Sequence, residues 1–163
     1  MSVDSDGIGF RKHNHTGCIN ATLDVAEARC VRRQLRLTTI RRRVLEILLR
    51  EHKAMGAYEI LEQLQADGHR SQPPVAYRAL DFLVQLGVVH KIERLNAFIA
   101  CSQPDNRHTP LFMICRGCEQ VAEISANASR NTLANAARDS GFQLERTVIE
   151  AEGLCPACQR SAA

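Results

Sequence analysis

The chain has 163 residues, about one folded domain and a fraction of another. With 45% hydrophobic and 24% charged residues, it has the composition of a globular protein, and disordered, collagen-like or coiled-coil chains are excluded. The net charge of +3 is small, but seven arginines and no acidic residue lie between Arg29 and Arg43. This uneven charge predicts a polyanionic partner.

The sequence has no stretch of about 20 apolar residues that could cross a membrane. Residues 1–6 lack the basic start and the apolar stretch of a signal peptide. We therefore expect a cytoplasmic protein without a membrane partner. In a reducing compartment, seven cysteines indicate metal binding or redox chemistry rather than disulfides.

The first two thirds of the chain predict a winged helix-turn-helix over residues 21–102, after a flexible leader over residues 1–20. Apolar residues recur at helical spacing in four segments: residues 22–36, a segment starting at the N-cap Thr38, residues 57–66 and residues 73–86. Pro73 and Pro74 suit the first turn of the fourth helix, and Gly87 ends it. A hairpin turning near Leu95 and Asn96 follows and forms the wing.

The last third predicts a small α/β domain over residues 110–163, connected by a polar hinge over residues 103–109. Its expected elements are short strands over 111–114 and 121–124, a helix over 129–140 and a long strand over 142–150. The fold class is therefore α+β. A unit this small is not stable on its core alone, which favours a structural metal.

Two Cys-x2-Cys pairs in this domain, Cys115 with Cys118 and Cys155 with Cys158, have the spacing of zinc knuckles. Each tight turn presents two thiolates, and two turns complete a tetrahedral shell of four. The alternative is two unrelated buried or redox-active pairs. The spacing of the two pairs favours a zinc site over that alternative. A zinc ion closed in by four thiolates has a structural role.

A second group of ligands is suggested by the wing. If the hairpin turns at Leu95 and Asn96, His90 and Cys101 face each other directly and can share one ion. His108 of the hinge and Glu123 of the next domain could complete four ligands. The alternatives are a solvent-facing wing histidine, a core cysteine, a loop histidine and a surface carboxylate.

Several segments resemble the ferric uptake regulator (Fur) family, and within it the zinc uptake regulator (Zur) branch, over residues 21–159. The matching segments are residues 73–83 (PPVAYRALDFL), residues 87–91 (GVVHK), the two cysteine pairs and residues 153–155 (GLC). The resemblance implies two zinc ions per chain, a structural one on the four cysteines and a regulatory one on His90, Cys101, His108 and Glu123. The chain has Val75 and Ala76 where the family usually has Thr-Val, and Thr38, Thr39 and Ile40 where it usually has Thr-Pro-Gln.

The same resemblance implies a zinc-responsive transcriptional repressor that binds palindromic operators of zinc-uptake genes as a zinc-loaded homodimer. One winged helix reads one half-site, so a twofold pair reads two, and we expect the C-terminal domain to dimerise. Arg78 is expected to contact a guanine and Tyr77 a thymine methyl or a phosphate. The alternative for Arg78 and Tyr77 is an ordinary solvated helix face. Lys91, Arg41 and Arg42 are expected to contact phosphates.

Other functions remain possible from the sequence. An iron- or peroxide-sensing relative would share the fold, but the thiolate of Cys101 favours four-coordinate zinc. A zinc-storage protein or metallochaperone would leave the winged helix without a role. A zinc or thiol-redox enzyme is disfavoured because two complete ligand sets leave no open coordination position, so we expect no catalysis and no small-molecule substrate. His13, His15 and Cys18 are either an accessory metal site or incidental residues of the leader.

Overall fold

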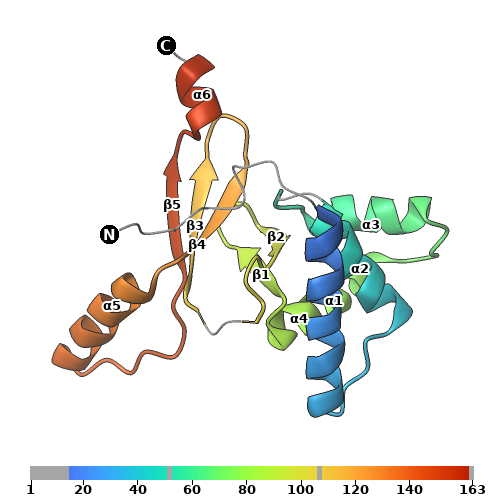
Figure 1. Ribbon diagram of the computed structural model, residues 1–163, viewed down its shortest axis with the longest axis horizontal. Helices are drawn as coiled ribbons and strands as arrows, with labels where there is room; N and C mark the ends of the chain where they lie inside the picture. The colour runs from blue at the N-terminus through green and yellow to red at the C-terminus, as the bar shows by residue number, and fades with distance from the viewer. Residues whose placement is uncertain (1–14, 51–52, 106–107, 162–163) are drawn as a thin grey trace. The chain divides into compact units, whose positions relative to one another are not determined.

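The computed structural model describes residues 15–50, 53–105 and 108–161. Their contacts divide them into two compact units, with the boundary after Asp105, inside the predicted hinge. The first unit holds four helices and a two-stranded hairpin, and the second holds a three-stranded sheet with two helices (Figure 1). This is the α+β class expected from the sequence. None of the helices in these ranges is long and apolar enough to cross a membrane.

The helices of the first unit are close to those predicted, except at the N-terminus: α1 (His15–Arg32), α2 (Thr39–Arg50), α3 (Ala57–Ala66) and α4 (Pro73–Leu86). The leader prediction is wrong for residues 15–20, which form the first turns of α1. The apolar stripe of α1 extends into this segment, since Ile19 packs against the core. Residues 1–14, with His13, lie outside the described ranges.

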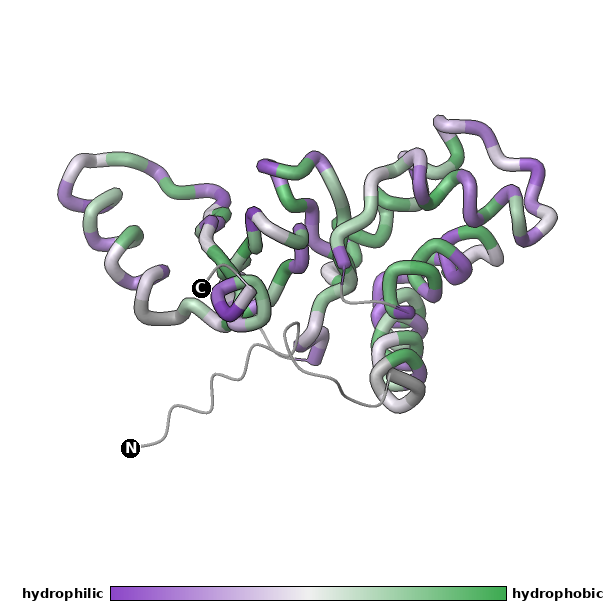
Figure 2. Tube along the Cα trace, turned by 90° about the horizontal axis from the view of Figure 1, so that it is seen from above, coloured by the Kyte–Doolittle hydropathy of each residue, from purple (hydrophilic) through white to green (hydrophobic). Residues whose placement is uncertain are grey.

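The helices pack through one face each, and hydrophobic and hydrophilic bands alternate along them (Figure 2). Fully buried leucines and isoleucines from three of them form the centre of this core: Leu45, Leu48, Ile60, Leu64, Leu80 and Leu83. Thr38 caps α2, because its Oγ1 accepts a hydrogen bond from the N–H of Arg41 at 3.4 Å. Gly87 ends α4 in the left-handed conformation, with φ of 82°.

The wing consists of β1 (Val89–Ile92) and β2 (Ala97–Ala100), which are antiparallel. Its register differs from the prediction: His90 pairs with Ile99, and the N–H of Cys101 bonds to the carbonyl of Val88 at 2.9 Å. The loop spans four residues and centres one position earlier than predicted, and Asn96 takes the left-handed conformation at its end, with φ of 45°. A shift of two residues preserves the face, so His90 and Cys101 become diagonal rather than direct neighbours.

The second unit contains β3 (Pro110–Cys115), β4 (Val121–Ser125), α5 (Asn127–Asp139), β5 (Ile149–Gly153) and α6 (Pro156–Ser161). The strand order is β4-β3-β5, with β3 antiparallel to β4 and parallel to β5. The predicted strand over 142–150 is wrong, because β5 begins only at Ile149. The alternating apolar residues that suggested it lie at the surface instead: Phe142, Leu144 and Val148 are 65%, 39% and 39% exposed.

Candidate metal sites and nucleic-acid surface

The parallel pairing of β3 and β5 brings the two cysteine pairs together. Cys115 ends β3 and lies opposite Gly153, the last residue of β5, so the turn after each strand starts at the same edge of the sheet (Figure 1). Cys118 lies in the turn after β3, Cys155 lies two residues after β5 and directly before α6, and Cys158 lies in α6. The four Sγ atoms all lie within 4.8 Å of one another.

The backbone around the cluster is fixed by local hydrogen bonds. The N–H of Glu119 donates to the carbonyl of Cys115 at 2.8 Å, and the N–H of Cys115 donates to the carbonyl of Gln120 at 2.9 Å. At Gly117 a Cβ atom would lie only 3.1 Å from the Sγ of Cys158. A glycine at this position therefore allows the two turns to approach closely.

The thiols of the cluster differ in pKa because their hydrogen bonds differ. The N–H of Cys155 donates to the Sγ of Cys115 at 3.2 Å and, as the main cause, lowers the pKa of Cys115 to about 6. Hydrogen bonds with the other three sulfurs, that of Cys155 above all, raise the pKa of Cys158 to about 12. Four crowded thiols that stabilise one thiolate match the donor set of a tetrahedral zinc ion. Zn–S bonds of about 2.3 Å separate the sulfurs by about 3.8 Å, and the Sγ atoms of Cys118 and Cys155 are 3.7 Å apart.

The other predicted ligands fall into two pairs, one in each unit. In the first unit His90 lies in β1 and buried Cys101 directly follows β2, with ligand atoms within 4.8 Å of each other. In the second unit the Nε2 of His108 lies 2.6 Å from the Oε1 of Glu123, which is in β4. Both of these side chains are buried, at 6% and 3% exposure, which explains their close contact because a buried carboxylate needs a polar partner.

The predicted DNA-contacting residues lie on α4, the wing and α2. Tyr77 and Arg78 are exposed on α4, and the Nε of Arg78 donates to the carbonyl of Pro74 at 3.1 Å. Lys91 of the wing forms an ion pair with Glu93 at 3.1 Å. The Cζ of Arg41 lies 3.6 Å from the ring centroid of Phe82, an arrangement that fixes the guanidinium on one side of α4.

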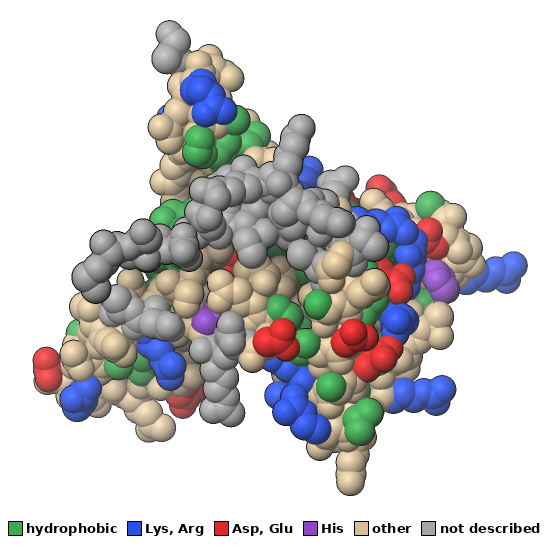
Figure 3. Space-filling model, in the orientation of Figure 1, with side chains coloured by type: hydrophobic (Ala, Val, Ile, Leu, Met, Phe, Trp, Pro, Cys, Tyr) green, Lys and Arg blue, Asp and Glu red, His purple; other side chains and the backbone are tan. Residues whose placement is uncertain are grey.

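The arginine-rich stretch is less available to a polyanion than its sequence predicts. Arg42 pairs with Glu27 and Glu46, and Arg43 with Glu46 and Asp67. Two further arginines, Arg29 and Arg33, donate to backbone carbonyls at the end of α4. Acidic residues outside the stretch, both near it in sequence (Glu46) and far from it (Asp67), thus neutralise part of its charge, and Figure 3 shows Asp and Glu side chains interspersed with Lys and Arg over this unit.

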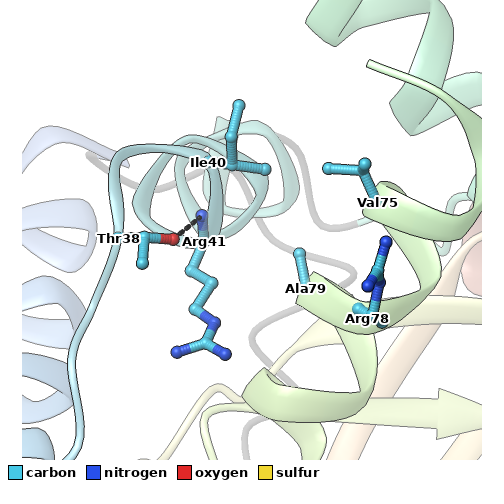
Figure 4. A pocket seen from close by; sticks show the side chains of 6 residues that line it. All are labelled: Thr38, Ile40, Arg41, Val75, Arg78 and Ala79. Atoms are coloured by element: carbon cyan, nitrogen blue, oxygen red, sulfur yellow. Dashed lines mark hydrogen bonds between the residues drawn. The ribbon is translucent and has the colours of Figure 1, made fainter.

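A hollow of about 300 Å³ lies between the N-terminal turns of α2 and α4. Three aliphatic side chains, two arginines and one threonine line it: Thr38, Ile40, Arg41, Val75, Arg78 and Ala79 (Figure 4). Sequence reasoning singled out Ile40 and Val75 as departures from a family pattern but did not place them together. Helical periodicity describes one helix at a time, and the contact between two helices is what forms this hollow.

Comparison with known proteins extends over most of the chain. The model of the ferric uptake regulator family matches residues 32–152. The zinc uptake regulation protein of Escherichia coli K12 is 40% identical over 134 residues, which cover 82% of this chain and 78% of that protein.

Two solved structures have the same fold. One is a zinc uptake regulator complexed with zinc and DNA, with a TM-score of 0.83 and 36% identity, covering 93% of this chain and 99% of that chain. The other is holo XcZur, with a TM-score of 0.78 and 38% identity, covering 89% and 99%. From the family match and the high identity of these relatives, the chain belongs to the ferric uptake regulator family.

Proposed function

We propose that this chain is a zinc-responsive transcriptional repressor that binds operator DNA as a homodimer and holds two zinc ions per chain. The similarity to a zinc uptake regulation protein and to a regulator complexed with zinc and DNA supports this function. The single observation that carries it is the pairing of donors: His90 with Cys101 in one unit and His108 with Glu123 in the other.

The first zinc ion is structural and is held by Cys115, Cys118, Cys155 and Cys158. Its support is the close approach of the four Sγ atoms and the stabilised thiolate of Cys115. A shell of four protein thiolates has no open position for a substrate, so this ion contributes to folding rather than to catalysis.

The second zinc ion is regulatory and is held by His90, Cys101, His108 and Glu123. One thiolate, two imidazoles and one carboxylate suit a four-coordinate zinc ion better than an ion that prefers six oxygen ligands. When bound, the ion joins donors from both units and so fixes the winged helix relative to the rest of the chain. Changing a conformational ratio from 1:99 to 99:1 requires about 5.5 kcal/mol of differential binding, which a four-ligand zinc site can supply.

DNA recognition uses α4 and the wing. Arg78 contacts a guanine, Tyr77 a thymine methyl or a phosphate, and Lys91, Arg41 and Arg42 contact phosphates. The ion pairs of Lys91 and Arg42 are partly exposed and contribute little to stability, so both side chains can exchange a carboxylate for a phosphate.

The homodimer forms through the second unit. This unit exposes several large apolar side chains: Met113, Leu133, Phe142, Leu144 and Val148. A twofold pair that covers them presents two winged helices to two half-sites of a palindrome, about one helical turn or a multiple of it apart.

A gel-shift titration with zinc tests the function. Cys101→Ser is expected to raise the zinc concentration for half-maximal operator binding about tenfold or more, because even a residue that only orients a ligand changes metal affinity by about 10–100-fold. The matched control is Cys30→Ala, which alters a buried cysteine outside both ligand sets and should leave the zinc dependence unchanged. Unchanged zinc dependence in Cys101→Ser would contradict the regulatory site, and restoration of binding by ferrous iron but not zinc would contradict the zinc specificity.

A further inference from the structure

The hollow between α2 and α4 has mostly apolar walls, and two arginines are the charged residues that line it. Ile40 extends from the first turn of α2 and Val75 from the first turn of α4, and the two side chains point toward one another (Figure 4). Buried Ala79 lies next to them on α4. Nonpolar carbon therefore lines most of the space, which is large enough for a methyl group and the ring edge that carries it.

The rim of the hollow is positively charged. Arg41 and Arg78 line it from the two helices, and the N-termini of α2 and α4, which carry partial positive charge, lie at its sides. An apolar or acidic peptide would also tolerate such a rim. The charge complementarity favours a polyanion that also presents an apolar group, and double-stranded DNA does so in its major groove.

The position of Val75 on α4 relates the hollow to base recognition. Val75 lies three residues before Arg78 and four before Ala79, so the three side chains share one face of the helix. The N-terminal residues of a recognition helix contact base edges in the major groove. If Arg78 contacts a base, as in the proposed function on which this step rests, Val75 lies near the neighbouring base step.

We propose that the hollow formed by Ile40, Val75 and Ala79 receives the C5-methyl group of an operator thymine, next to the base that Arg78 contacts. The thymine methyl is the apolar feature of the major groove, and the other base edges there present hydrogen-bond donors or acceptors. Ile40, Val75 and Ala79 offer no side-chain polar group to pair with such an edge. Val75 is thus a specificity-determining residue, and it selects thymine through the methyl group alone.

The test removes that methyl group from the DNA. An operator duplex selected from a random library with the zinc-loaded protein is remade with deoxyuridine in place of one thymine at a time. At one position in each half-site, the wild-type protein should lose about threefold to tenfold in affinity, as expected for one methyl group that leaves an apolar contact. Val75→Ala should bind the thymine and uracil duplexes with nearly equal affinity at that position.

Controls separate the hollow from other contacts. Val31→Ala alters a valine that is 78% exposed on α1 and should keep the wild-type preference for thymine at every position. The isosteric Val75→Thr replaces one methyl group by a hydroxyl group and should reduce the preference without changing the melting temperature. A preference due to Tyr77 would persist in Val75→Ala.

The outcomes distinguish this inference from the function on which it rests. If no uracil substitution weakens wild-type binding, or if every thymine preference persists in Val75→Ala, the hollow does not read a thymine methyl. Either result would leave zinc-dependent operator binding intact. If the wild-type protein selects no duplex in a zinc-dependent manner, the proposed function itself is wrong, and the inference about this subsite is then wrong as well.

Discussion

At the scale of single residues, a substitution of Cys118 can distinguish the stability that a metal ion provides from the stability that side-chain packing provides. It is the one exposed thiol of the four-cysteine cluster, whereas Cys115 and Cys155 are buried. Burial of its side chain therefore contributes little to stability. Any large effect of removing this sulfur must come from the lost metal ligand.

Cys118→Ser is accordingly expected to remove one zinc ion per chain and to destabilise the second unit by several kcal/mol, because structural zinc supplies folding free energy on the order of 10 kcal/mol. Atomic emission measures the metal content, and thermal unfolding followed by circular dichroism measures the stability. Cys101→Ser serves as the control and should retain the structural ion. Normal metal content and melting temperature in Cys118→Ser would contradict a structural zinc site.

The residues of the cluster could be predicted from spacing because each pair lies within one turn. Cys115 and Cys118 are separated by two residues, and so are Cys155 and Cys158. The regulatory ligands have no such spacing, and for His90, Cys101, His108 and Glu123 the residues alone left ordinary alternatives open. Pairing across the hairpin suggested His90 and Cys101, and the resemblance to a family then favoured the full set over those alternatives.

Arg29 shows how two helices are joined at the scale of elements. From the last turns of α1 its guanidinium donates to the carbonyls of Leu86 and Gly87, at 3.0 and 2.9 Å, and also to the carbonyl of Pro104. The final carbonyls of a helix lack partners within the helix and carry partial negative charge, so a cation there is favourable. Arg29 thus holds the C-terminal end of α4 against α1.

Arg29→Met keeps much of the aliphatic length of the side chain and removes these donors. We expect the free energy of unfolding to fall by about 1–3 kcal/mol, because hydrogen bonds that involve a charged group contribute about that much. Urea unfolding measures it. Arg32→Met, which alters an exposed arginine of the same helix, is the matched control and should change stability by less than about 0.5 kcal/mol. Equal losses in the two variants would show that Arg29 does not hold α4.

Helices and strands could be predicted well where proline or glycine marks their ends, and less well elsewhere. Pro73, Pro74 and Gly87 fix α4, and apolar periodicity identifies α2 and α3. The hairpin register was wrong by two residues because nothing in its loop signals whether it has two residues or four. The strand predicted over 142–150 was wrong because alternating apolar residues indicate burial only when another surface covers them.

The charge that a helix presents at its surface also depends on ion pairs with other elements, which the order of residues in the sequence does not show. No acidic residue lies between Arg29 and Arg43, yet Glu27 of α1, Glu46 of α2 and Asp67 beyond α3, all outside this stretch, pair with two of its arginines. A run of one charge in the sequence therefore overstates the charge that the folded unit presents.

The two proposed zinc ions should differ in affinity at the scale of the whole molecule. The cysteine cluster lies within one unit, on turns that backbone hydrogen bonds already fix. The proposed regulatory site takes two ligands from each unit, so its occupation must also restrict the motion of one unit relative to the other. This ordering costs conformational entropy and weakens the apparent affinity for the second ion.

Mild chelation of the purified protein is therefore expected to lower the zinc content from two ions per chain to one and to abolish operator binding at the same step. Far-ultraviolet circular dichroism should stay unchanged, because the cysteine cluster keeps its ion, and added zinc should restore binding with a stoichiometry of one ion per chain. Metal analysis and gel shifts on the same samples measure both quantities. In Cys101→Ser the untreated protein should already contain one ion, and chelation should remove nothing further. Operator binding that survives the loss of the first ion would disprove coupling between zinc and DNA, and simultaneous loss of both ions would disprove the predicted difference in affinity.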